Sequence, residues 1–201
     1  MSAGADSVVE DGLVFGVSLQ TEQFSLEPLT SNDFDALYAL ASDPKLWEQH
    51  LEADRWKRFK FQRFFQGGLA NDLGCFVMRE KRSGRPAGSS RFYGYDEVDW
   101  CMSISYAFSA RELWGTSANR EKKEAMLLRA VTVVDRVFFD IGPQNFRFIA
   151  AVKKLGAVFS HDESYTEAVY VLSKQQWFKS SSVSQVEASL HEQNTQAHKL
   201  R

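Results

Sequence analysis

The feature that most constrains the fold is an apolar pattern in the second half of the chain that changes twice from the spacing of a strand to that of a helix. Residues 98–108 and 136–141 have the character of strands, and each run is followed by a segment with helical spacing. Each change passes through a turn that contains glycine, Gly115 in the first case and Gly142 in the second. Two successive turns from strand to helix open on the same edge of a sheet, so a ligand can lie in the crevice between them.

The two predicted helices have recognisable ends. The first begins just after the turn at Gly115. The second covers residues 145–155 and ends at Gly156, a residue suited to a C-cap. The apolar stripe of the first helix consists of Met126, Leu127, Ala130, Val131 and Val134.

The preceding half of the chain predicts a strand, further helices and an antiparallel meander. Residues 75–80 and 86–95 read as strands, and Gly84 in the turn between them is free to adopt a positive φ. Residues 98–108 extend this pair into a meander. The remaining elements are a strand at 24–29, a helix with Phe34, Leu37, Tyr38 and Ala41 on one face, a helix start at Asp43-Pro44, a basic aromatic helix over 51–66 that ends at Gly67-Gly68, and two short strands at 157–160 and 168–172.

This order of elements predicts a mixed α+β layer in one domain. The chain has 201 residues, of which 44% are hydrophobic, and this is enough for one sizeable core. Residues 1–19 are mixed in character and residues 180–201 are polar, so we expect both to be mobile ends. The predicted folded domain therefore spans residues 20–179.

The charge balance narrows the class of partner. Lys and Arg number 24 against 26 Asp and Glu, so the formal net charge is -2 and argues against nucleic acid or an anionic membrane as the main partner. No apolar run is long enough to cross a membrane, and the N-terminus lacks the pattern of a signal peptide. Cys75 and Cys101 are too few for a disulfide framework and have no metal-ligand spacing. We expect a cytoplasmic protein with reduced thiols and no metal site.

The stretch 113–119 (LWGTSAN) is the strongest local motif. It lies between a predicted strand and the start of a helix, where backbone N–H groups lack helical partners and the helix dipole is positive. Such a turn binds anions, and a pyrophosphate fits it. The motif is neither a Walker loop nor a dinucleotide fingerprint, because it has only one glycine. Taken alone, a glycine turn before a helix more often binds nothing.

Together, WGTSANREKKEAMLLRA and RVFFDIGPQNFRFIAAVKKLGA resemble the GNAT superfamily of acetyl-CoA-dependent N-acetyltransferases, and within it the RimJ/RimL-like branch of ribosomal-protein acetyltransferases. The order of elements follows the family from about Phe24 to Leu172. The resemblance implies a central, mostly antiparallel sheet with helices on both faces. It also implies acetyl-CoA as co-substrate and an amine as acceptor.

The resemblance assigns roles to particular residues. In the family, the turn before the long helix binds the pyrophosphate through backbone amides, and the strand before it pairs with the pantetheine arm. An asparagine on the later helix lies beside the cofactor. Carried over to this chain, the pyrophosphate residues are Gly115, Thr116, Ser117, Ala118 and Asn119, the pantetheine strand is Tyr106, Ala107 and Phe108, and the asparagine is Asn145.

Three positions depart from the family pattern. Ser117 stands where a second glycine is usual, so the pyrophosphate must approach a Cβ atom. Ser103 stands where a carboxylate often acts as general base, and Phe148 where a serine hydroxyl protonates the leaving thiolate. Glu97 and Asp99 share strand parity with Ser103, but at about 3.3 Å per residue they lie too far away for direct proton transfer.

Three functions remain open from the sequence. The leading one is an N-acetyltransferase in which a primary amine, of a protein N-terminus or of a small molecule, attacks the thioester directly, with Tyr106 as the candidate acid. The second is a weakly active or inactive module that binds CoA or a partner. The third is a nucleic-acid module that uses the basic face of residues 55–63. We expect a monomer or homodimer, with neither nucleic acid nor membrane as a partner.

Overall fold

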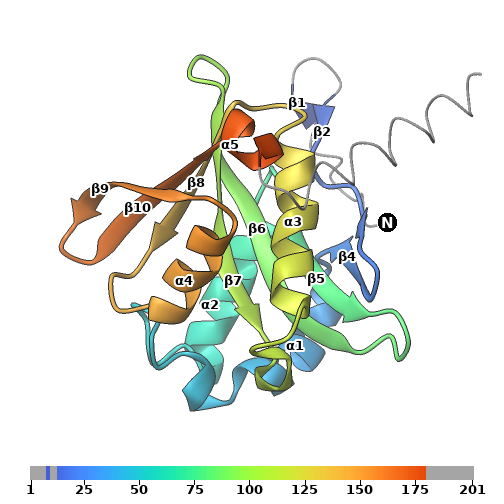
Figure 1. The fold of residues 1–201 in the computed structure, drawn as a ribbon. Helices are drawn as coiled ribbons and strands as arrows, with labels where there is room; N and C mark the ends of the chain where they lie inside the picture. Colours follow the sequence, from blue (N-terminus) through green and yellow to red (C-terminus); the bar gives the residue numbers. More distant parts are fainter. Residues whose placement is uncertain (1–7, 10–12, 180–201) are drawn as a thin grey trace, which may run out of the picture.

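The structure, a computed structural model, describes residues 8–9 and 13–179 (Figure 1). Its strands are β1 (Val8–Val9), β2 (Leu13–Val14), β3 (Leu19–Gln20), β4 (Phe24–Pro28), β5 (Cys75–Glu80), β6 (Pro86–Asp96), β7 (Cys101–Ser109), β8 (Arg136–Ile141), β9 (Val158–Ser164) and β10 (Glu167–Ser173). Its α-helices are α1 (Phe34–Ala41), α2 (Arg58–Leu69), α3 (Ala118–Ala130), α4 (Phe146–Lys154) and α5 (Lys174–Lys179). Short 3-10 turns lie at Ser31–Asp33, Pro44–Leu46 and Arg111–Leu113.

Within the described residues, an eight-stranded sheet runs in the order β3-β4-β5-β6-β7-β8-β10-β9. Every neighbouring pair in it is antiparallel except β7 and β8, which are parallel and joined through α3. The tight turn between β5 and β6 has Gly84 at φ 71°. The mostly antiparallel mixed sheet and the meander are therefore confirmed.

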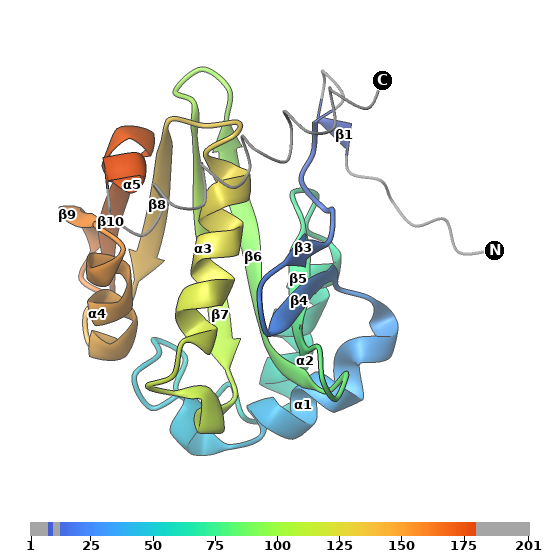
Figure 2. The same ribbon diagram turned by 45° about the vertical axis from the view of Figure 1, so that its right-hand side comes forward.

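Helices cover both faces of the sheet, because side chains alternate along each strand. On β5, Phe76 packs in the core beneath α3 and α4, whereas its neighbour Val77 packs against α1 and α2. Figures 1 and 2 show α3 and α4 on one face of the sheet and α1 and α2 on the other. None of the helices in residues 13–179 is long and apolar enough to cross a membrane.

The prediction for helix 51–66 is wrong at both ends. The helix begins only at Arg58, because residues 51–57 form turns in which Arg55 N–H donates to Glu52 O and Lys57 N–H donates to Asp54 O. It then continues through the two glycines to Leu69. A Cβ atom on Gly68 would lie 3.0 Å from both Cys75 Sγ and Leu29 Cδ2, so this glycine lets the helix approach the sheet closely. It does not end the helix.

The limits of the domain remain a prediction. Residues 180–201, 1–7 and 10–12, on which most of the predicted mobile ends fall, lie outside the described residues. Phe15 precedes the expected boundary at residue 20, yet its side chain is fully buried in the core beneath α3. The packed part of the chain thus starts earlier than the composition indicates.

Candidate functional site

Strand β7 carries a bulge at Tyr106. On β6, Ser89 pairs with Phe108 and Arg91 pairs with Ser105, so β7 has one extra residue in this interval. Tyr106 adopts a φ of 51°, which is uncommon for a residue with a side chain. The extra residue reverses the alternation of side chains: Ile104 packs beneath α3, whereas Phe108 packs with α1 and α2.

Beyond the parallel pairs, β7 and β8 diverge. Their register runs from Cys101 with Arg136 to Ser103 with Phe138, and it stops before the bulge. On the other side of β7, Tyr106 and Ala107 have no partner residue in the register with β6. The backbone polar groups of Ala107 are therefore available to a ligand that enters between the strands.

A groove of about 1170 Å³ opens at this divergence. It runs from the end of β7 past the turn before α3 and along α4. Of the residues expected at the cofactor, the groove is lined by Ala107, Phe108, Gly115, Thr116, Ser117, Asn119 and Asn145. Ala118 is buried behind the turn, where it packs with Phe24 and Met78.

The charge of this groove is uniform. Every charged side chain that lines it, within the part of the chain that the structure describes, is basic. This contrasts with the net charge of -2 of the whole chain. A groove of this kind attracts a ligand with several negative charges, such as phosphates. Arg120 and Arg147 are also paired with Glu124 and Glu48, which lie outside the groove lining. The basic residues are Arg120, Lys122, Lys123, Arg147, Lys154 and Lys179.

The turn before α3 has the geometry of an anion site. Gly115 has a φ of 77°, and a Cβ atom built on it would meet nothing within 4 Å, so the space in front of it is open. The first bond that closes the helix runs from Glu121 N–H to Ser117 O at 2.9 Å. The N–H groups of Asn119 and Arg120 precede that bond and remain available as donors.

Ser117 occupies the N-cap position of α3 but does not cap it with its side chain. Its hydroxyl donates to Glu121 Oε1 at 2.9 Å and accepts from Gln23 Nε2 at 3.2 Å. The first turn of α3 is therefore tied to the segment before β4. The Cβ atom of Ser117 occupies the position where the family usually has none.

Two buried lysines on α3 contribute to the groove, and sequence reasoning missed both. Lys122 Nζ donates to Ser109 Oγ at 2.7 Å and to Phe108 O at 3.0 Å, and burial lowers its pKa to about 7. Lys123 Nζ donates to Asn119 Oδ1 at 2.7 Å and lies 4.4 Å from the centre of the Phe148 ring. Burial, and then the charge of Lys122, lower the pKa of Lys123 well below its usual value.

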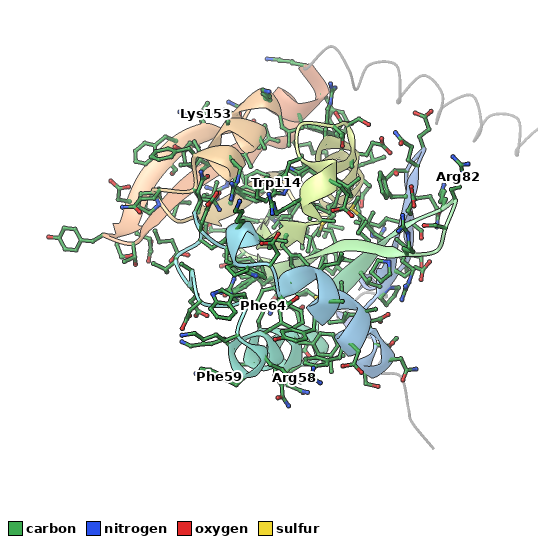
Figure 3. All side chains as sticks on the ribbon, turned by 90° about the horizontal axis from the view of Figure 1, so that it is seen from below. Arg58, Phe59, Phe64, Arg82, Trp114 and Lys153 are labelled. Atoms are coloured by element: carbon green, nitrogen blue, oxygen red, sulfur yellow. The ribbon has the colours of Figure 1, made fainter. Side chains whose placement is uncertain are left out.

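The start of α4 faces the turn before α3 across the groove. Asn145 caps α4, since its Oδ1 accepts from Phe148 N–H at 3.2 Å, and it is buried. The guanidinium of Arg147 lies 4.0 Å from the centre of the Trp114 ring and forms an ion pair of 2.9 Å with Glu48. Figure 3 shows Trp114 at this end of the molecule, viewed from below.

A second cavity of about 200 Å³ lies on the other side of the bulge. His50, Ala107, Asn145 and Phe148 line both the cavity and the groove, so the two spaces meet at these residues. A ligand in the groove can thus present its end to a second molecule in the cavity. The polar side chains of the cavity include Glu52, Arg55, Tyr93, Ser105, Asp140 and Glu167.

Tyr106 lines the smaller cavity, next to Ala107 of the junction, and its ring is supported by neighbours. The Arg91 guanidinium carbon lies 4.2 Å from the ring centre, and the Tyr93 ring lies 5.1 Å away in an edge arrangement. Arg91 is itself buried and donates to Phe64 O at 3.0 Å. The contacts with Arg91 and Tyr93 thus hold the Tyr106 ring in place, while the residue is still 42% exposed.

The carboxylate that the structure brings to the smaller cavity is Asp140, and not one of the two that share strand parity with Ser103. Glu97 and Asp99 line neither space, and Asp99 pairs with Arg136 at the far end of β7. Asp140, on β8, accepts a hydrogen bond from the Tyr93 hydroxyl. Burial, followed by the charge of Asp140, raises the pKa of Tyr93, so the phenol stays protonated. The position of Asp140 depends on how β8 pairs with its neighbouring strands, so it could not be read from the sequence.

His50 is the other group that the sequence did not single out. Burial, with the charges of Arg55 and Arg147 added, lowers its pKa to about 4. Its imidazole is therefore neutral at pH 7 and able to accept a hydrogen bond. The position of His50 in the sequence does not predict its place in the cavity, because the cavity is formed by segments that are distant in sequence.

Comparison with known proteins agrees with this geometry. No curated protein sequence matches the chain. Among solved structures, a GCN5-related N-acetyltransferase from Brucella melitensis has a TM-score of 0.70 at 17% identity, covering 81% of this chain and 80% of that one. A spermidine N-acetyltransferase from Vibrio cholerae, in complex with CoA and spermine, has a TM-score of 0.63 at 12% identity, with coverage of 78% and 99%. A proposed ribosomal-protein-serine acetyltransferase from Vibrio cholerae has a TM-score of 0.64 at 14% identity, with coverage of 80% and 99%.

At these identities the solved structures share the fold. The family model of the acetyltransferase (GNAT) domain matches residues 23–158, which is more than half of the chain. This range contains β7 with its bulge, the turn before α3, and α4 with Asn145. The protein therefore belongs to the GNAT acetyltransferase family, whose members transfer acetyl groups from acetyl-CoA.

Proposed function

We propose that this protein transfers the acetyl group of acetyl-CoA to a primary amine, either of a protein N-terminus or of a small molecule. The observation that carries the proposal is the basic groove, which ends at the bulge of β7 and meets the smaller cavity there. The groove suits a long anionic cofactor, and the cavity suits its acceptor. Membership of the GNAT family supports the use of acetyl-CoA.

In this proposal the cofactor lies along the groove with its phosphates at the turn before α3. The turn of Gly115, Thr116, Ser117, Ala118 and Asn119 holds the pyrophosphate through its backbone amides, of which Thr116 N–H and Ala118 N–H also donate within the turn, to Leu113 O and Thr116 Oγ1 at 3.3 Å. The pantetheine arm pairs with the strand Tyr106, Ala107 and Phe108, in which Ala107 has backbone groups available and Phe108 O already accepts from Lys122. Asn145 lies beside the arm at the start of α4, where it lines the groove.

The reaction is a direct attack on the thioester. The neutral amine forms a C–N bond to the acetyl carbon, the C–S bond breaks, and the proton that leaves the nitrogen balances the proton that the CoA thiolate takes up. Tyr106 is the candidate acid for the thiolate, since Phe148 fills the place of the family's serine. Ser103 offers no carboxylate, so we assign most of the rate to positioning of the two substrates.

The same departures favour one alternative, a module that binds CoA with little or no turnover. Ser103 and Phe148 remove two groups that assist proton transfer in the family. This alternative predicts the same groove and the same cofactor affinity. The two functions differ only in whether the thioester is cleaved.

The proposal also covers binding partners, oligomeric state and subcellular location. We propose a RimJ/RimL-like protein of the cytoplasm, a monomer or homodimer, that binds neither nucleic acid nor membrane. Ion pairs of Lys57 with Asp54 and of Arg58 with Asp35 offset much of the charge of the basic stretch. Arg58 lies on the outer side of α2 (Figure 3). Binding of nucleic acid through residues 55–63 would weaken steeply with salt, and flat binding curves would exclude it.

The test is calorimetric titration of the purified protein with acetyl-CoA, followed on the same sample by thiol release with a panel of amines and N-terminal peptides. Binding together with thiol release establishes the transferase and identifies its acceptor. Binding without release from any acceptor favours the non-catalytic module. Failure to bind acetyl-CoA contradicts both functions.

A further inference from the structure

The cavity beside Tyr106 carries the opposite charge to the groove. Its ionisable lining consists of three carboxylates, Arg55, the neutral His50 and the two tyrosines. Arg55 is already engaged: it lies 3.4 Å from Glu52, and its guanidinium carbon is 4.7 Å from the centre of the Phe64 ring. The negative charge that remains uncompensated therefore belongs to Asp140 and Glu167.

Asp140 and Glu167 come from neighbouring strands and act on the same space. In the pairing of β8 with β10, Asp140 lies opposite Val169, and Glu167 begins β10 two residues earlier. Burial raises the pKa of Glu167, and the nearby charge of Asp140 raises it further. Two carboxylates that lie close enough to affect one another's pKa repel one another when both are charged, and a bound cation relieves the repulsion.

The walls and size of the cavity restrict what it can hold. Tyr93 and Tyr106 both line it, and aromatic faces favour ammonium groups. The volume of about 200 Å³ is below the range of about 300–1,000 Å³ common for drug-sized ligands. A short, unbranched amine fits such a space.

We propose that the acceptor is a small amine with a second positive charge, and that Asp140 and Glu167 hold this second ammonium group. The inference rests on the proposed function, and it narrows the acceptor from primary amines in general to short diamines. One nitrogen loses its proton and faces the thioester where the cavity meets the groove. The other remains charged between the two carboxylates, so an acceptor with a carboxylate at that end is repelled.

The first experiment compares three acceptors that each contain four carbons, at saturating acetyl-CoA: 1,4-diaminobutane, butylamine and 4-aminobutanoate. We expect kcat/KM for the diamine to exceed that for butylamine at least about tenfold, which corresponds to about 1.4 kcal/mol. The aminobutanoate should be the poorest acceptor. Equal values for the diamine and butylamine would overturn the inference while leaving the transferase intact.

The carboxylates are tested with Asp140→Asn and Glu167→Gln, which keep the shape of each side chain and remove its charge. Asp140→Asn retains an oxygen that accepts from Tyr93, and the Glu167 side chain is only half-buried, so both variants should fold. Each should reduce the preference for the diamine over butylamine by about tenfold, through KM. Asp162→Asn removes one charge from the same β9–β10 hairpin outside the cavity, and it should leave the preference unchanged.

A binding measurement keeps the inference separate from turnover. Titration of the CoA-loaded protein with 1,4-diaminobutane and with butylamine requires no reaction, so it decides the point even if no thiol is released. We expect tighter binding of the diamine and loss of that difference in Glu167→Gln. Equal affinity for the two amines contradicts the inference, whereas thiol release with neither amine contradicts only the proposed transfer.

Discussion

Gly115 and Ser117 are the residues at which a single substitution should affect cofactor binding most. Gly115 needs its positive φ, and the space in front of it is free of protein atoms. We predict that Gly115→Val abolishes CoA binding, because the branched side chain disfavours that φ and fills the phosphate space. Ser117→Glu should abolish binding by placing a negative charge against the phosphates. Calorimetric titration with CoA measures both effects.

Ser117→Gly is the matched control for this pair. It removes the Cβ atom from the phosphate side and should preserve or tighten CoA binding. It also removes the hydrogen bonds to Glu121 and Gln23, both of which are exposed, so the loss of stability should be small. Unchanged affinity in folded Gly115→Val and Ser117→Glu would show that the cofactor lies elsewhere.

Tyr106 combines an unusual backbone with a side chain that lines the smaller cavity. Tyr106→Phe keeps the ring contacts with Arg91 and Tyr93 and removes only the hydroxyl. If this hydroxyl protonates the thiolate, kcat should fall about a hundredfold while the affinity for acetyl-CoA stays the same. Single-turnover thiol release measures the step directly. A rate equal to that of the wild type would assign the proton to water.

At the level of elements, α2 owes its close packing to glycine. We predict that Gly68→Ala destabilises the protein although alanine favours helices, because the new methyl group meets Cys75 and Leu29 at 3.0 Å. Gly67→Ala is the matched control, since its Cβ meets only the end of the Arg91 side chain at 3.4 Å. It should be neutral or stabilising by up to about 1 kcal/mol. Urea unfolding of the two variants gives the comparison, and equal effects would contradict it.

The elements also show what the sequence can and cannot predict. The alternation of strands and helices and the turn at residues 113–119 are local patterns, and the structure has them close to where the sequence indicates. The cap that the Asn145 side chain forms on α4 is a feature of the structure that the sequence analysis did not predict. The bulge at Tyr106 is not a local pattern, since it depends on the register between β6 and β7. The start of α2 at Arg58 was missed because the helical spacing continues upstream through residues that form turns.

The same distinction applies to the site. Most residues proposed for the cofactor are contiguous in sequence, so a short motif reveals them. His50, Asp140 and Glu167 come from three separate segments and meet only after the sheet has formed. Tertiary pairing therefore creates the acceptor cavity, and no spacing in the sequence encodes it.

At the scale of the whole molecule, the buried Lys122 links stability to pH. Its pKa is about 7 in the folded protein, against 10.5 for an ordinary lysine, so the unfolded chain binds more protons between these values. The burial penalty is fully present below pH 7 and decreases as the pH rises from 7 towards 10. Lys122→Met has no such group. We predict that the difference in unfolding free energy between wild type and Lys122→Met shifts in favour of the wild type over this range, as urea unfolding at several pH values measures. A constant difference would show that Lys122 stays charged.

The inserted residue in β7 acts as a frameshift within the fold. Ile104, before it, belongs to one hydrophobic core, and Phe108, after it, belongs to the other. The two halves of β7 therefore pack against different helices. A change of side-chain size before the bulge would have to be matched by a change on α3, and one after the bulge by a change on α1 or α2. Deletion of Tyr106 would leave Ser105 opposite Arg91 and Phe108 opposite Ser89 in a regular ladder, so it would remove the bulge and leave both cores with their side chains. A single deletion elsewhere in β7 would instead move the side chains beyond it to the opposite face of the sheet.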